Sequence, residues 1–206
     1  MPALAIRLAP MTLEMYQRYA QEYENDPDLY LDPGKYVHYE YSPERAEQYF
    51  QRQIDRGRIL LAILSGTEIV GEIVIKNIEP HVCATMGLTL KNASWKDRGI
   101  GTAAEKLAVA YVFNELDIPT LYADSIQPNT RSQHVLEKVG FTLVREDESF
   151  KYYRIDRAGK QDVSRETIVS EAKVIHDRID PAGETIAIDY RMDRPEEGQH
   201  DSYSAV

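Results

Sequence analysis

Residues 95–102 read Trp95-Lys96-Asp97-Arg98-Gly99-Ile100-Gly101-Thr102, and the predicted elements on either side are arranged around this segment. It follows a strand-like run at residues 86–90 and opens a helix-like run at residues 103–116. Its two glycines let the backbone turn tightly and approach a ligand closely. The amides that begin a helix have no partner inside it and carry the positive end of the helix dipole. A strand, a glycine turn and a helix N-terminus therefore predict a phosphate or pyrophosphate site, with Lys96 and Arg98 adding positive charge.

The spacing of this loop argues against two better-known phosphate loops. A dinucleotide fingerprint has three glycines in the pattern G-x-G-x-x-G, whereas the third position here is Ala104. An ATP-type loop ends in Gly-Lys-Ser or Gly-Lys-Thr, and neither tripeptide occurs in the sequence. An ordinary strand-to-helix turn stays open as the alternative to a phosphate site.

Composition and charge limit the classes of function. The chain has 206 residues, 43% of them hydrophobic and 28% charged, which is typical of a soluble globular protein. No apolar run approaches the roughly 20 residues of a membrane-spanning helix. The net charge of −10 argues against nucleic acid and anionic membranes as partners and favours cationic amines, although it also fits simple solubility. Cys83 is the single cysteine, which excludes an internal disulfide and fits a cytoplasmic protein.

Periodicity, caps and turn residues predict the order βααβββαβαββ, a mixed α/β layer structure. The predicted helices begin at Thr12, at Ser42-Pro43, after the glycine loop and at residues 129–130. The predicted strands lie at residues 6–8, 59–64, 68–75, 82–90, 121–126, 141–145 and 150–155. Gly87 interrupts the fourth strand, which predicts a bulge or a close backbone approach.

Two further segments carry predictions about packing. Residues 28–41 hold four tyrosines without a clean period, so they either wall a pocket or pack as ordinary buried aromatics. The helix after the glycine loop is predicted to bury one face. That face consists of Ala104, Leu107, Ala108, Tyr111 and Val112.

A second motif follows at residues 128–141. It contains Asn129-Thr130-Arg131-Ser132 and ends in Glu137-Lys138-Val139-Gly140-Phe141. Together with residues 96–102 and the element order, it resembles the GNAT superfamily of acyl-coenzyme A N-acyltransferases. That family has Gln/Arg-x-x-Gly-x-Gly/Ala, then Asn-x-x-Ser and Glu-Lys-x-Gly-Phe. The resemblance covers roughly residues 4–155, is strongest to the branch that acetylates ribosomal-protein N-termini, and implies a GNAT-like domain at residues 1–155 with a splayed central sheet.

The resemblance implies acetyl-coenzyme A as co-substrate and no metal. The backbone of Leu88, Thr89 and Leu90 would pair with the pantetheine amides, beside the bulge at Gly87. Asn129 matches the family asparagine that reaches the coenzyme, although its position equally suits a helix cap. The pyrophosphate would be held by the loop residues Lys96, Asp97, Arg98, Gly99, Ile100, Gly101 and Thr102.

The catalytic positions depart from the family pattern. Many members have a tyrosine acid where this chain has Leu136, and a glutamate base where it has Thr85. We predict Ser132 as the acid and Glu72, on the neighbouring strand, as a base acting through water. The alternatives are a local helix cap for Ser132 and a solvent-facing strand position for Glu72.

Residues 156–206 extend beyond the family's usual end and are acidic overall. Alternating apolar residues at 185–192 predict a β-hairpin, followed by a disordered tail, and this extension is the predicted contact of a homodimer. The predicted activity is direct transfer of an acetyl group from acetyl-coenzyme A to a primary amine. The acceptor is a protein N-terminus, a polyamine or another small amine. The alternative from another class is a coenzyme-binding sensor or interaction module that has lost catalysis.

Overall fold

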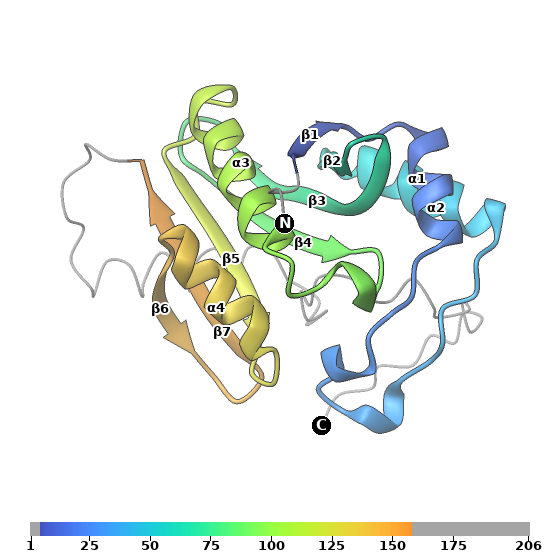
Figure 1. Ribbon diagram of the computed structural model, residues 1–206. Coiled ribbons are helices and arrows are strands. Elements are labelled where there is room, and N and C mark those ends of the chain that lie inside the picture. The colour runs from blue at the N-terminus through green and yellow to red at the C-terminus, as the bar shows by residue number, and fades with distance from the viewer. Residues whose placement is uncertain (1–4, 158–206) are drawn as a thin grey trace, which may run out of the picture.

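The computed structural model describes residues 5–157, which form one mixed sheet flanked by helices (Figure 1). The sheet has seven strands in the order β1-β2-β3-β4-β5-β7-β6. Every neighbouring pair is antiparallel except β4 and β5, which run parallel. The strands are β1 (Ile6–Pro10), β2 (Ile59–Ser65), β3 (Glu68–Glu79), β4 (Cys83–Leu90), β5 (Thr120–Ile126), β6 (Thr142–Glu146) and β7 (Phe150–Asp156).

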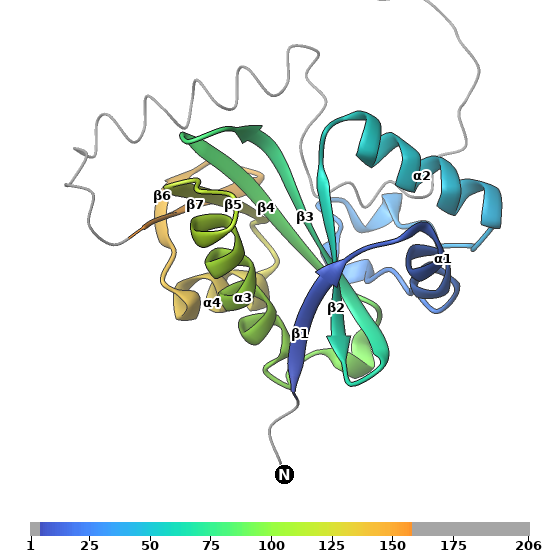
Figure 2. The ribbon, with the colours of Figure 1, turned by 90° about the horizontal axis from the view of Figure 1, so that it is seen from above.

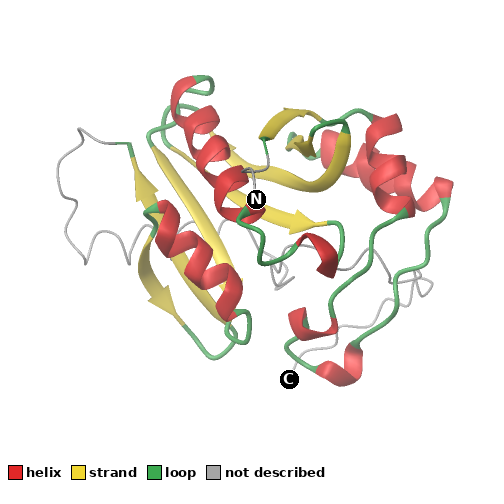
Figure 3. Ribbon diagram, viewed as in Figure 1, coloured by secondary structure: helices red, strands yellow, loops and turns green. Residues whose placement is uncertain are grey.

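Helices cover both faces of the sheet. Figure 2 shows α3 and α4 on one face and α1 and α2 on the other. Figure 3 shows short helical turns in the loops between the longer elements. The α-helices are α1 (Leu13–Gln21), α2 (Pro43–Asp55), α3 (Ile100–Asn114) and α4 (Thr130–Val139), and the 3-10 turns are η1 (Pro27–Leu29), η2 (Pro33–Lys35) and η3 (Ala93–Trp95). The predicted order βααβββαβαββ is thereby confirmed.

The helices begin and end where side chains satisfy their terminal backbone groups. The Thr12 hydroxyl accepts a hydrogen bond from the Met15 amide at the start of α1. The Ser42 hydroxyl does the same for α2, whose first residue is Pro43. α4 ends at Gly140 in the left-handed conformation, at φ 112°. These caps are local, which is why the sequence predicts the helix starts well.

The two faces of the sheet bury different kinds of side chain. Beneath α3 and α4 the core is aliphatic, with Ile73 and Leu121 fully buried. Beneath α1 and α2 it is rich in tyrosine, and the rings of Tyr16 and Tyr49 stack with centroids 5.0 Å apart. Tyr39, from the tyrosine-containing loop, packs edge-on against Tyr23 and is buried. The α1–α2 loop therefore contributes aromatic packing to this second core.

The sheet opens between β4 and β5. The parallel ladder between them runs only from Cys83–Thr120 to Met86–Ala123. The ladder between β3 and β4 continues without a shift across Gly87, so the predicted bulge at that residue is wrong. The close backbone approach lies at Gly71, where a Cβ atom would stand 2.4 Å from the carbonyl oxygen of Thr89. The opening therefore comes from the divergence of two strands and needs no inserted residue.

One side of α3 also differs from its predicted pattern. Leu107 is 39% exposed, whereas Glu105 is buried at 4% exposure. The remaining core positions include Ala104, Ala108 and Val112, as predicted. The helix is rotated so that its buried stripe includes a carboxyl group, and this places Glu105 beside the opening in the sheet.

Two predictions concern residues that the structure does not describe. The predicted C-terminal hairpin and the dimer contact lie outside residues 5–157. Within the described residues, none of the helices has the length and apolar character required to cross a bilayer.

Candidate active site

A cavity lies where the sheet opens between β4 and β5. It encloses about 830 Å³ of space, counting its solvent-open mouth. Leu88, Thr89 and Leu90 of β4 form one wall, and the first turns of α3 and α4 form another. The α1–α2 loop closes a third side with residues that include Tyr23 and Leu29. The cavity thus joins the predicted coenzyme-binding strand, the glycine loop and the tyrosine-rich side of the molecule.

The glycine loop presents an open helix N-terminus. Asp97 and Gly99 have positive φ angles of 57° and 77°, so the chain turns sharply before Ile100. Gly99 is the N-cap of α3, and no side chain caps the amides that follow it. Backbone amides left open at the positive end of a helix dipole suit a phosphate group. The loop therefore fits the pyrophosphate role predicted for it.

The edge of β4 suits an extended ligand chain. Beyond Met86, β4 no longer pairs with β5, while its pairing with β3 continues to Leu90. Leu88 and Leu90 therefore keep one hydrogen-bonded neighbour and turn their other edge toward the cavity. An unpaired strand edge binds an amide-containing chain as an added strand would. Pantetheine is such a chain, and these residues fit the predicted contact.

The predicted coenzyme-binding residues divide into two groups. Those that line the cavity are Leu88, Thr89, Leu90, Lys96, Gly101 and Asn129. Those that lie in the loop without lining the cavity are Asp97, Arg98, Gly99, Ile100 and Thr102. Ile100 is 1% exposed and belongs to the aliphatic core, so its side chain anchors the loop to the sheet.

The charged side chains of the loop have partners. Lys96 forms an ion pair with Asp26 from the α1–α2 loop, and both side chains are largely buried. Asp97 accepts a hydrogen bond of 3.1 Å from Arg131 at the start of α4. Arg98 lies over the Trp95 ring, at 4.6 Å from its centroid. Arg131 lines the cavity and was not predicted, since its position in a helix reveals nothing of its distance from the loop.

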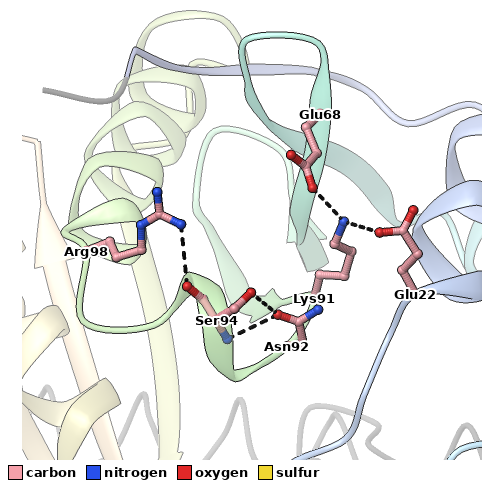
Figure 4. A network of polar contacts seen from close by, with 6 residues as sticks. All are labelled: Glu22, Glu68, Lys91, Asn92, Ser94 and Arg98. Atoms are coloured by element: carbon pink, nitrogen blue, oxygen red, sulfur yellow. Dashed lines mark hydrogen bonds and ion pairs between the residues drawn. The ribbon is translucent and has the colours of Figure 1, made fainter. Parts of the chain in front are cut away.

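A buried lysine fixes the wall of the cavity (Figure 4). The Nζ atom of Lys91, at the end of β4, donates to Glu22 Oε2 at 2.6 Å and to Glu68 Oε1 at 3.0 Å. Burial alone lowers the pKa of Lys91, but the two carboxylates outweigh burial and leave its pKa raised. The Glu24 amide donates to the Lys91 carbonyl oxygen at 2.9 Å. The C-terminal end of α1 is thereby tied to the end of β4.

The two predicted catalytic residues lie in different places. Ser132 lines the cavity, and its amide donates to Asn129 Oδ1 at 3.1 Å, so Asn129 both caps α4 and lines the cavity. Glu72 is 4% exposed, which excludes a solvent-facing position, but it does not line the cavity. Burial raises the pKa of Glu72 to about 8. Tyr16 is a close neighbour, since burial and then the charge of Glu72 raise the tyrosine pKa.

Glu105 is the most buried of the acidic cavity residues that the sequence did not predict. It lines the cavity from α3, and burial raises its pKa to about 8. Glutamate in a helix is normally solvent-facing, so the sequence pattern gave no direct sign of its burial. The available signal is spacing, because residues four apart share a helix face and Glu105 follows Gly101 by four.

Comparison with known proteins identifies the family. The model of the acetyltransferase (GNAT) domain matches residues 5–142. The chain belongs to the GNAT acetyltransferase family. This GNAT protein is therefore an acetyl-coenzyme A-dependent N-acetyltransferase with the mixed α/β fold of that family, as predicted from its two motifs. No match is found among curated proteins by sequence.

Solved structures share the fold of this GNAT protein at low sequence identity. Aminoglycoside acetyltransferase AAC(6')-Ib in complex with coenzyme A is 16% identical with a TM-score of 0.60, and the match covers 74% of this chain and 95% of the other. A GNAT-family acetyltransferase from Bacillus anthracis is 17% identical with a TM-score of 0.59, covering 76% and 97%. A ribosomal L7/L12 alpha-N-protein acetyltransferase in complex with coenzyme A is 17% identical with a TM-score of 0.58, covering 75% and 96%.

Proposed function

We propose that this enzyme transfers the acetyl group of acetyl-coenzyme A directly to a primary amine, with both substrates bound in the cavity together. The observation that carries the proposal is the shape and lining of the cavity. It extends from an open helix N-terminus, along an unpaired strand edge, to a loop that carries carboxylates. One end suits the anionic coenzyme and the other suits a cation.

Acidic side chains in the cavity wall support the proposal that the acceptor is an amine. Glu24, Asp26 and Asp124 all line the cavity. Asp124 pairs with the ammonium of Lys76 at 3.8 Å, and Asp26 pairs with Lys96, so an acceptor ammonium at either carboxylate would compete with a lysine of the chain. Carboxylates focus negative potential into a cleft and raise the local concentration of a cationic substrate. A protonated amine is such a substrate, and it must lose a proton before it attacks.

A direct attack fits the nucleophiles that the chain offers. Cys83, the only cysteine, is buried and is not part of the cavity wall, so it is not placed to form an acyl-enzyme. Glu72 is proposed to take the amine proton through water, because burial leaves its carboxylate basic enough to do so near pH 8. The amine nitrogen then bonds to the acetyl carbon, and the sulfur departs.

The names of two of the similar structures mention an acceptor, and the two acceptors are of different kinds. One structure holds AAC(6')-Ib with coenzyme A and kanamycin, and another is a ribosomal L7/L12 alpha-N-protein acetyltransferase. Both acceptors are amines, a small polyamine-like molecule and a protein N-terminus. We propose that the acceptor of this enzyme falls within these two classes and that it works in the cytoplasm.

The test is a calorimetric titration with acetyl-coenzyme A, followed by free-thiol release against a panel of amines. The panel contains N-terminal peptides, polyamines and aminoglycosides. Micromolar binding with amine-dependent thiol release is the expected result. Binding without release would favour the sensor alternative, for which the apolar Leu136 in the cavity wall is the structural argument. Absence of binding would refute the proposal.

A further inference from the structure

Glu105 is a buried carboxyl group in the cavity wall to which the mechanism above gives no role. Its side chain is 4% exposed, and it lines the cavity from the second turn of α3. Its Oε2 atom is buried and has no hydrogen-bond partner among the described residues. A buried polar atom without a partner costs stability, and an apolar side chain would fill this position without that cost. What glutamate offers at this position, and an apolar side chain does not, is an ionisable carboxyl group.

The surroundings of Glu105 keep it protonated at neutral pH. Small and apolar side chains share this part of the cavity wall, among them Met86, Ala123 and Leu136. Burial is the cause that raises its pKa to about 8. Besides Tyr23, the ionisable side chains that line the same cavity are Glu24, Asp26, Lys96, Asp124 and Arg131. None of these five is among the causes of the shift.

Glu105 lies where a coenzyme chain would end. Gly101, one turn earlier in α3, belongs to the loop proposed for the pyrophosphate, and both residues line the cavity. A pantetheine chain that leaves this loop and follows Leu88–Leu90 reaches the point where β4 and β5 separate, at Met86 and Ala123. The thioester is at the end of pantetheine. Glu105 lines the cavity together with these two residues.

We propose that Glu105 is the general acid that protonates the departing sulfur of coenzyme A. This inference rests on the proposed function. The nitrogen lone pair forms the C–N bond at the acetyl carbon, and the C–S electron pair leaves with the sulfur. Glu105 transfers its O–H proton to that sulfur, which gives the free thiol and leaves Glu105 as a carboxylate. The ammonium first loses one proton to solvent. After the C–N bond forms, the nitrogen loses a second proton, which passes through water to Glu72. Glu72 then releases this proton to solvent, and Glu105 regains one from solvent, before the next turnover.

The other side chains near this position are poorer proton donors. Leu136 stands where many family members have a tyrosine, and it carries no proton to give. The Ser132 hydroxyl is a far weaker acid than a carboxyl group. A thiol has an ordinary pKa of about 8.5, so a donor with a pKa of about 8 is closely matched to it.

The test compares Glu105→Gln with Glu115→Gln. Glutamine keeps the shape of the side chain but cannot transfer a proton. Glu115 is exposed at the C-terminal end of the same helix, so its variant is the matched control. In Glu105→Gln we expect the maximal rate of thiol release to fall about a hundredfold or more, with the calorimetric affinity for acetyl-coenzyme A unchanged. In Glu115→Gln both quantities stay at the wild-type level.

The pH dependence provides a second readout. The wild-type rate is expected to fall above pH 8 as Glu105 loses its proton, and this decline disappears in Glu105→Gln. A third readout needs no turnover. In protein labelled with ¹³C at the glutamate carboxyl carbons, the resonance missing from Glu105→Gln should titrate near pH 8 in the wild type.

Three results would overturn the inference. One is a Glu105→Gln rate within about threefold of wild type with the alkaline decline intact, since general acids contribute far more than that. Another is the joint loss of coenzyme binding and turnover, which indicates a structural role. If Glu105→Gln does not fold, Glu105→Leu can replace it, because leucine fills the site with an apolar side chain. The third overturning result is thiol release by Glu105→Leu at the wild-type rate. Absence of amine-dependent thiol release in the wild type would instead refute the proposed function.

Discussion

Gly99 shows how one residue shapes the coenzyme loop. Its φ angle of 77° lies in the left-handed region, and no atom stands within 4 Å of an added Cβ atom. The constraint at this position is therefore conformational and not steric. The turn that exposes the amides of α3 depends on a residue without a side chain.

Gly99→Ala is accordingly expected to lower the free energy of unfolding by about 1 kcal/mol, the cost of the left-handed conformation. Urea denaturation measures this change. Gly101→Ala is the control for stability, because Gly101 has no positive φ and its added Cβ atom would meet Val135 at an ordinary 3.8 Å. An equal loss in both variants would contradict the conformational explanation.

Lys96 and Glu105 have surroundings that the sequence alone does not reveal. The pairing of Lys96 with Asp26 joins segments 70 positions apart, and no local pattern reports it. The prediction placed Lys96 on a phosphate, whereas the structure places it against a carboxylate. Glu105 was missed for a similar reason, because burial of a helical carboxyl depends on the rotation of the helix in the fold.

The helices and strands themselves were predicted closely, since their signals are local. Thr12, Ser42 and Asn129 all cap the helices that they were predicted to begin. The bulge at Gly87 failed because the register of two strands depends on both of them. A glycine in one strand is compatible with a regular ladder as well as with a bulge.

Asn129 caps α4 and is proposed to contact the coenzyme, and substitution can separate these two roles. Asn129→Ala removes the cap on the Ser132 amide, and we expect a loss of about 1 kcal/mol in stability. Asn129→Asp keeps an oxygen for the cap but places a negative charge on the cavity wall. Its stability should equal that of wild type, while its affinity for acetyl-coenzyme A falls about tenfold, equivalent to about 1.4 kcal/mol of repulsion.

Urea denaturation and calorimetric titration distinguish the two roles. If Asn129→Asp binds acetyl-coenzyme A as tightly as wild type, Asn129 caps the helix without facing the coenzyme. If Asn129→Asp is as unstable as Asn129→Ala, the oxygen of the side chain is not what stabilises α4.

Two buried carboxyl groups make the free energy of unfolding of this protein depend on pH. Glu72 and Glu105 lie on opposite faces of the sheet, and burial raises the pKa of each from 4.5 to about 8. A raised pKa means that the folded state holds the proton more tightly than the unfolded chain. The stability from this source is complete below pH 4.5 and is lost progressively as the pH rises to about 8.

Glu105→Gln should therefore gain stability relative to wild type between pH 5 and pH 8.5. The relative gain is up to a few kcal/mol. Urea denaturation at the two pH values measures it, with Glu115→Gln as the variant in which no such gain is expected. A constant difference between Glu105→Gln and wild type at both pH values would show that the carboxyl is not buried as described.

The ion pair between Lys96 and Asp26 links the two ends of the cavity. Lys96 belongs to the loop proposed to bind the coenzyme, and Asp26 belongs to the loop proposed to face the acceptor. A ligand that attracts either side chain out of this ion pair changes the charge that the other end of the cavity presents. Under the proposed function, this ion pair would couple the binding of the two substrates thermodynamically. Whatever factor the coenzyme imposes on the affinity for the amine, the amine must impose on the affinity for the coenzyme.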